Sequence, residues 1–156
     1  MLYRPYESGD FATLYAVEEL CFEPPFRFSR AYMRQLVHHR DAATWIAEEA
    51  ARLAGFAIVE WAGEPDETAA YIATIEVHPA WRRRGIGAEL LRRVEASAIA
   101  AGAQTIWLHV DAENSAAIRL YESRDYLRQG REERFYTRHR AALVYSKKLQ
   151  DVQTTP

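Results

Sequence analysis

The chain has 156 residues, 49% of them hydrophobic and 27% charged, which suits one globular domain with one core. Its net charge of −2 argues against broad nucleic-acid binding, and its single cysteine excludes an internal disulfide framework. Without a secretory signal pattern or an apolar run near the ~20 residues of a membrane span, we expect a cytoplasmic protein that binds neither nucleic acid nor membrane.

The N-terminal half predicts strands and helices in alternation. A strand at residues 2–5 precedes a helix with Asp10 at its N-cap, and Glu23-Pro24-Pro25 ends that helix because proline removes a backbone donor. Cys21, among apolar residues of this helix, is interpreted as a core filler rather than a nucleophile. Ser29 begins a second helix, which runs to about residue 40. Strands follow at residues 44–48, 53–61 and 70–77.

The C-terminal half continues the mixed α/β order. A long amphipathic helix follows Gly85 and ends near Gly102, a residue typical of helix C-termini. The remaining elements are predicted as strands at 104–110, 126–130 and 142–148 and a helix at 114–123. We predict a single domain over residues 1–150 and a flexible tail over 151–156.

The most informative stretch joins the strand at 70–77 to the long helix. Arg82-Arg83-Arg84-Gly85-Ile86-Gly87 brings cations and glycines to a helix N-terminus, where free N–H groups and the helix dipole favour a phosphate. An ordinary solvated helix start is the alternative. A Rossmann motif fits poorly because the third glycine is missing, and a P-loop is excluded because no Gly-Lys-Ser/Thr follows.

A second segment makes this pattern more specific. Residues 108–122, Leu-His-Val-Asp-Ala-Glu-Asn-Ser-Ala-Ala-Ile-Arg-Leu-Tyr-Glu, follow the first at a fitting distance. Together the two segments resemble the acetyl-CoA motifs of the GCN5-related N-acetyltransferase (GNAT) family. The resemblance implies an α/β fold with a mixed, mostly antiparallel sheet of about six or seven strands, parted at the cofactor site and flanked by about four helices. The family usually has glycine where Asp125 stands here, but Asp tolerates a left-handed backbone.

Within the family, the closest resemblance is to the protein N-terminal acetyltransferases. The strand Tyr71-Ile72-Ala73-Thr74-Ile75, the loop Phe22-Glu23-Pro24-Pro25-Phe26 and the late aromatic pair in Arg134-Phe135-Tyr136 resemble theirs. The implied partner is a protein or peptide N-terminus that receives an acetyl group directly from acetyl-CoA. A GNAT enzyme that acetylates a small amine, such as a polyamine or antibiotic, is the alternative. An acetyl-CoA-binding module without activity is a third reading.

The resemblance also implies the catalytic residues. Tyr71 and His109 are the candidates for the base, with a bridging water as a further possibility, and Tyr121 would protonate the leaving thiolate. The ordinary pKa of histidine, about 6.5, suits an α-amine better than a lysine side chain. Taken singly, a structural strand histidine and a core tyrosine are the plainer interpretations of His109 and Tyr121.

The remaining site residues are expected in two groups. The cofactor-binding residues implied are Ile75, Val77, Arg82, Arg83, Arg84, Gly85, Ile86, Gly87, Ala88, Asn114, Ala117 and Tyr121. The substrate pocket is expected to be lined by Phe22, Pro24, Phe26 and Tyr136, although such aromatics can simply cover the core. The histidines lack metal-ligand spacing, so no metal is expected. Glu18-Glu19 and Glu132-Glu133 are expected on solvated faces, the second pair able to attract a basic peptide.

Overall fold

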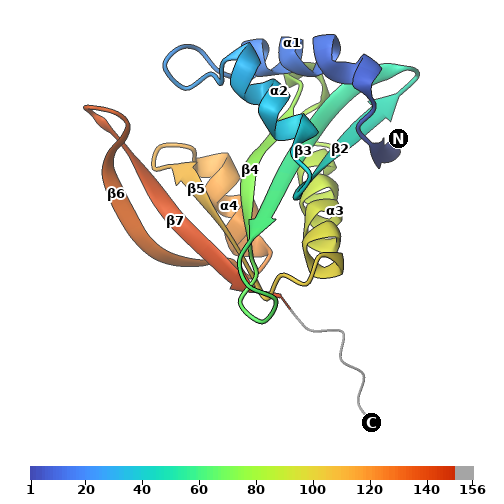
Figure 1. Ribbon diagram of the computed structural model, residues 1–156. Helices are drawn as coiled ribbons and strands as arrows, with labels where there is room; N and C mark the ends of the chain where they lie inside the picture. The colour runs from blue at the N-terminus through green and yellow to red at the C-terminus, as the bar shows by residue number, and fades with distance from the viewer. Residues whose placement is uncertain (150–156) are drawn as a thin grey trace.

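The computed structural model describes residues 1–149, which form one seven-stranded sheet with helices on both faces (Figure 1). The predicted tail at 151–156 lies outside the described residues. The strands are β1 (Leu2–Pro5), β2 (Ala42–Glu49), β3 (Arg52–Ala62), β4 (Ala69–Val77), β5 (Thr105–Asp111), β6 (Leu127–Thr137) and β7 (Arg140–Lys148), in the spatial order β1-β2-β3-β4-β5-β7-β6. The helices are α1 (Phe11–Cys21), α2 (Arg30–His38), α3 (Ile86–Ala100) and α4 (Ser115–Ser123), with short 3₁₀ turns at Ser8–Asp10 and Pro79–Trp81.

The sheet is antiparallel except between β4 and β5, and that parallel ladder is short. It joins residues 69–71 to residues 105–107, and no residue pair links the two strands beyond Tyr71 and Trp107. A β-bulge at Ala73 interrupts the pairing of β4 with β3 at this level, and a bulge bends its strand. The sheet is therefore parted between β4 and β5, as the sequence predicted. The strand and helix numbers also confirm the predicted fold class.

Alternate residues of β3 separate the core into two layers. Ala57 and Val59 pack with α3, whereas Phe56 and Ile58 pack with α1 and α2 on the other face. Leu90 and Val94 of α3 are fully buried in the first layer, and Leu14 and Met33 of α1 and α2 are fully buried in the second. This burial holds α1, α2 and α3 against the sheet. No helix within residues 1–149 is long and apolar enough to cross a membrane.

The C-terminal elements differ in part from the sequence prediction. The strand predicted at 126–130 is instead β6, which runs to Thr137, because irregular pairing between Glu132 and Thr137 breaks the alternation that marks a strand. Arg134 has a φ of 57° within this irregular stretch. The predicted left-handed residue after α4 is confirmed, since Asp125 has a φ of 71° and Tyr126 N–H donates to the Tyr121 carbonyl.

Candidate active site

A cavity of 590 Å³ occupies the split in the sheet. Its floor comes from the diverging strands and its walls from three other segments, namely the loop between α1 and α2, the start of α4, and the β6–β7 hairpin (Figure 1). The lining residues are Cys21, Phe22, Glu23, Phe26, Phe28, Ile72, Ala73, Thr74, Ile75, His109, Val110, Asp111, Glu113, Asn114, Ala117, Tyr121, Tyr136 and Arg140. Parts of the chain more than a hundred residues apart thus meet around one space.

Tyr71 and His109 face each other across the split. The Tyr71 hydroxyl lies 2.8 Å from His109 Nδ1, a hydrogen bond between side chains of β4 and β5. Tyr71 is in the last ladder pair, with Trp107, and His109 follows on the same face of β5, so the point of divergence places the two side chains together. The rings of Trp107 and Phe135 pack on the pair, with Phe135 stacked 4.1 Å from the imidazole. The two residues predicted as base candidates form one unit.

Burial decides how this unit can carry a proton. It raises the pKa of Tyr71 well above the ordinary value, with smaller contributions from neighbouring Tyr136 and Tyr32. The phenol therefore stays neutral at physiological pH and does not act as a standing base. Its oxygen can pass a proton along the hydrogen bond to the imidazole, which is the group of the pair that can hold one.

Tyr121 of α4 lines the same cavity. Its side chain is buried, and burial raises its pKa, to which the nearby phenols of Tyr136 and Tyr71 add. A phenol held protonated in this way can donate a proton or a hydrogen bond. Asn114 caps α4, because its side-chain oxygen accepts from the Ala117 N–H at 3.1 Å, and both residues line the cavity beside Ile75. The predicted cap is confirmed.

The start of α3 presents a second feature, an open helix N-terminus. Gly85 has a φ of 76°, and the first helical hydrogen bond runs from Glu89 N–H to its carbonyl. The N–H groups at 86–88 therefore have no helical partner, and they lie beside the exposed side chains at 82–84. A helix N-terminus of this kind, flanked by cations, fits a pyrophosphate.

The side chains of residues 82–86 differ in how available they are to a bound anion. Ile86 is buried in the core, so only its backbone is available to a ligand. Arg82 donates to the Val77 carbonyl at 3.1 Å, and this bond occupies the backbone oxygen of one of the residues expected to bind the cofactor. Arg84 lies over the Trp81 ring and 3.8 Å from Glu49. We expect Arg83 and Arg84 to be freer than Arg82 to meet an anion.

The outer end of the cavity is aromatic. Phe22, Phe26 and Tyr136 line it as predicted, and the Phe26 and Tyr136 rings lie 5.2 Å apart, linking the α1–α2 loop to the hairpin. Pro24 is exposed and is not one of the lining residues. Sequence reasoning missed Phe28, which belongs to the same aromatic loop and whose carbonyl accepts from the Tyr15 hydroxyl at 2.8 Å.

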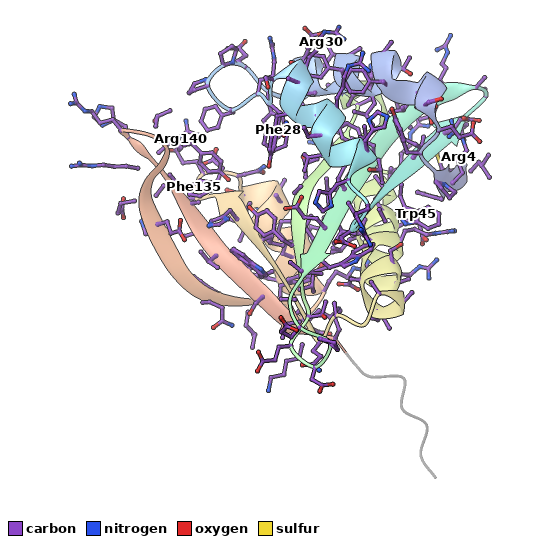
Figure 2. The ribbon with its side chains drawn as sticks, in the orientation of Figure 1. Arg4, Phe28, Arg30, Trp45, Phe135 and Arg140 are labelled. Atoms are coloured by element: carbon purple, nitrogen blue, oxygen red, sulfur yellow. The ribbon has the colours of Figure 1, made fainter. Side chains whose placement is uncertain are left out.

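Arg140 was also missed, and no sequence signal marks it. It extends from the hairpin over the Phe26 ring, with its guanidinium 5.2 Å from the ring centroid. It also binds two carboxylates of the β5–α4 turn, Asp111 at 2.6 Å and Glu113 at 3.0 Å. Figure 2 shows Phe28 on one side of this space and Phe135 and Arg140 of the hairpin on the other. Arg140 thus joins three of the segments that form the cavity wall.

Beneath the loop lies a buried pair of carboxyl groups. Glu18, expected on a solvated face, is instead 1% exposed, and Glu76 is 3% exposed. The prediction for Glu18 was wrong because α1 turns this side chain inward, where its Oε2 accepts the Phe28 N–H at 2.9 Å. Burial and the adjacent Glu18 raise the pKa of Glu76 well above its ordinary value. The same surroundings raise the pKa of Cys21 to about 11, which agrees with a packing role rather than a nucleophilic one.

Comparison with known proteins agrees with this geometry. The family model described as the acetyltransferase (GNAT) family matches residues 11–126. The [ribosomal protein bS18]-alanine N-acetyltransferase of Salmonella typhimurium is 43% identical over 72 residues, which are 46% of each chain. The N-alpha-acetyltransferase RimI of Mycobacterium tuberculosis is 33% identical over 113 residues, covering 72% of this chain and 66% of that one. An acetyltransferase of Sodalis glossinidius is 30% identical over 124 residues, 79% of this chain and 84% of its own.

Solved structures show the same fold over almost the whole chain. The ribosomal-protein-S18-alanine N-acetyltransferase of Escherichia coli superposes with a TM-score of 0.82 at 24% identity, covering 96% of this chain and 94% of that one. NAA60 of Arabidopsis thaliana in complex with acetyl-CoA gives 0.83 at 22% identity, covering 95% and 98%.

The parted sheet, the open α3 N-terminus and the family match define an acyltransferase of the GNAT class, and the chain belongs to the GNAT family. It is an N-acetyltransferase that uses acetyl-CoA as its acetyl donor.

Proposed function

We propose that the protein acetylates the α-amine of a protein or peptide N-terminus. The observation that carries this proposal is the 2.8 Å hydrogen bond from Tyr71 to His109, the member of the pair that lines the aromatic cavity. A neutral imidazole suits an α-ammonium, whose pKa of about 7.7–8.0 is low enough for a histidine to deprotonate it. The Salmonella relative is a ribosomal-protein-alanine N-acetyltransferase and the Mycobacterium relative is an N-alpha-acetyltransferase, and both activities support the same acceptor class.

The residues divide the reaction between them. Acetyl-CoA supplies the acetyl group as a thioester, and we propose that the α3 N-terminus, Arg83 and Arg84 hold its phosphates while Asn114 holds the pantetheine arm. The acceptor ammonium gives a proton to His109 through the Tyr71 hydroxyl or a water. The amine nitrogen then bonds to the acetyl carbon as the carbon–sulfur bond breaks.

Tyr121 completes the proton balance. Its protonated phenol gives the departing thiolate a proton, and the second proton lost by the acceptor nitrogen replaces it. Of the two protons that the ammonium loses, one therefore ends on the thiol and the other leaves to solvent. The raised pKa of Tyr121 keeps the donor form available throughout.

A small cationic amine is the second candidate acceptor. The structure places Glu23, Asp111 and Glu113 along the cavity, more carboxylates than the loop sequence indicated. Arg140 binds both Asp111 and Glu113, however, which offsets their charge. The aromatic side chains around Phe26 favour an apolar first residue over a polyamine.

The first test is a thioester-release assay with a panel of peptides and free polyamines. We expect turnover with peptides that begin with a small or apolar residue and little with polyamines. His109→Ala and Tyr71→Phe should each lower kcat by about a hundredfold or more, since general acid–base groups contribute about 10²–10⁴. Acetyl-CoA binding should be unchanged, because both residues lie away from the α3 N-terminus.

His38→Ala on exposed α2 is the matched control and should keep full activity. Full turnover in both His109→Ala and Tyr71→Phe would exclude the proposed mechanism. Turnover with polyamines alone would replace the N-terminal acceptor with the small amine.

A further inference from the structure

The second nitrogen of the His109 ring has no hydrogen-bond partner within residues 1–149, although it is buried. The side chain is 10% exposed, Phe135 covers one face of the ring, and Nδ1 is bonded to Tyr71. A buried imidazole N–H without an acceptor costs free energy, so a group that accepts from Nε2 should be close by.

Glu132 of β6 supplies that group. Its Oε1 lies 3.2 Å from His109 Nε2, close enough that a small rotation of the carboxylate makes a hydrogen bond. The irregular pairing between Glu132 and Thr137 folds this part of the hairpin over β5, although β7 separates the two strands in the sheet. The neighbouring Glu133 is more exposed and pairs with Arg131 instead. The expectation that Glu132 lies on a merely solvated face is therefore only half right, since its side chain is 52% exposed.

The position of a carboxylate fixes the state of the ring. A carboxylate only accepts, so the nitrogen facing it carries the proton, and a neutral imidazole has a single N–H. Nδ1 is then an acceptor, and the Tyr71 hydroxyl donates to it. This direction is the one needed for a proton to move from the acceptor amine through Tyr71 to the imidazole.

We propose that Glu132 is a positioning residue that acts through His109. It holds the Nε2–H tautomer and stabilises the imidazolium that forms when Nδ1 takes a proton. The ring later releases the Nδ1 proton to water by the path along which it arrived, and this release restores the Nε2–H tautomer. The division of labour is like that of the aspartate and histidine in a serine-hydrolase triad. The role of Glu132 during acetyl transfer rests on the proposed function, whereas its effect on the His109 tautomer does not.

Within residues 1–149, the other titratable groups near the ring are neutral or paired. Tyr71 on β4 and Tyr136 on β6 stay neutral, because burial raises the pKa of Tyr71 and raises the pKa of Tyr136 to about 12. Asp111 of β5 is paired with Arg140 of β7. Glu132 is left as the charged group that faces the imidazole among the described residues.

The decisive experiment is nitrogen-15 NMR of the histidine rings in the full-length protein at a pH where they are neutral. A His109→Asn sample assigns the His109 signals by their loss. We expect the native ring to be protonated at Nε2, and Glu132→Ala to shift it toward a mixture of tautomers or the Nδ1–H form. Glu132→Gln, which keeps an acceptor oxygen, should keep the tautomer. Glu133→Ala is the matched control and should change nothing.

A native Nδ1–H tautomer would overturn the inference, and so would a Glu132→Ala spectrum that matches the control. This result does not depend on finding an acceptor. If the native protein acetylates no amine, the proposed function fails while the tautomer still decides the role of Glu132.

Kinetics with a peptide substrate test the role of Glu132 during acetyl transfer. Glu132→Ala should lower kcat by about tenfold and leave the KM for acetyl-CoA unchanged. Glu132→Asp should restore part of kcat, and Glu133→Ala should behave as native. The catalytic role of Glu132 would be contradicted if Glu132→Ala and Glu133→Ala lowered kcat equally. It would also be contradicted if Glu132→Ala changed only KM.

Discussion

The loop over the acceptor end of the cavity is held by a carboxyl group that is itself buried. Glu18 accepts the Phe28 N–H, and Glu76 accepts the Thr74 hydroxyl at 2.7 Å, while the second oxygen of each carboxyl has no assigned partner within residues 1–149. Burial and the adjacent Glu18 raise the pKa of Glu76 well above its ordinary value, so the Glu76 carboxyl stays protonated to a higher pH than an exposed glutamate.

The raised pKa of Glu76 predicts a pH-dependent stability. The folded-state pKa of Glu76 lies above its usual value, so between about 4.5 and that raised pKa the folded protein binds more protons than the unfolded chain. Stability therefore falls as pH rises through this range. Glu76→Gln cannot ionise and should gain relative to the native protein as pH rises from about 4.5 to 8.

The expected gain is about 1 kcal/mol near pH 8, or roughly 2–4 °C in Tm, measured by thermal unfolding. Glu19→Gln on the exposed side of α1 is the control and should show no such trend. A Glu76→Gln protein equally destabilised at every pH would show that ionisation of Glu76 does not lower the stability of the folded protein in this range.

Some side-chain contacts could be predicted from the sequence and others could not. Tyr71 and His109 could be named as a pair because the family resemblance implies both, and the Asn114 cap was predictable because it is local. Glu18 and Glu132 were not, since charged residues are normally solvated and only the turn of α1 and the irregular β6 direct them inward. Arg140 gave no signal because its partners are distant in the chain.

Among the elements, α4 depends on one unusual backbone residue at its end. Asp125 takes the left-handed conformation that closes the helix onto Tyr126, which is fully buried and whose hydroxyl donates to Glu95 of α3. An L-residue in this conformation costs about 1–2 kcal/mol, less for Asp and Asn than for others. The end of α4 is thus tied to α3 through a strained turn.

The free energy of unfolding of Asp125 variants should depend on the cost of this left-handed conformation. Asp125→Ala should lower the free energy of unfolding by about 1 kcal/mol, because alanine tolerates a positive φ less well. Asp125→Gly should stay within about 0.5 kcal/mol of native, since relief of strain offsets the larger entropy of the unfolded chain. Urea denaturation measures both, with Asp125→Asn as the near-neutral control. An alanine variant as stable as the glycine variant would contradict this account.

The element boundaries show a similar division. The helix starts at Ser29 and Asn114 were predicted because side-chain caps are encoded within four residues. The length of β6 was not, because its bulges depend on pairing with β7 rather than on its own residues. Local chemistry was therefore predictable, whereas register between strands was not.

At the scale of the whole molecule, the split leaves one edge of β4 and one edge of β5 without a strand partner within residues 1–149. Residues 72–77 of β4 pair with β3 alone, and residues 108–111 of β5 pair with β7 alone. Acetyl-CoA bound between them should slow amide exchange on both edges, because a ligand that binds only the folded protein suppresses opening.

Hydrogen exchange followed by mass spectrometry checks this expectation. Protection on adding acetyl-CoA should be largest in peptides that cover 72–77 and 108–111. Residues 45–48 of β2, which pair with both β1 and β3, are the internal control and should change least. Equal slowing of amide exchange in all peptides would indicate general stabilisation of the fold rather than acetyl-CoA bound in the split.

The cavity wall also has a consequence for how such a protein can diversify. The residues assigned to the donor lie between 71 and 121, while those around the acceptor end come from the loop before α2 and from the β6–β7 hairpin. Phe26, Tyr136 and Arg140 join these two outer segments directly to each other. Exchange of the two outer segments as a matched pair would then change what is acetylated and leave the transfer chemistry intact. This arrangement predicts that a change of acceptor arises from substitutions in the α1–α2 loop and the β6–β7 hairpin, with the segment between them held constant.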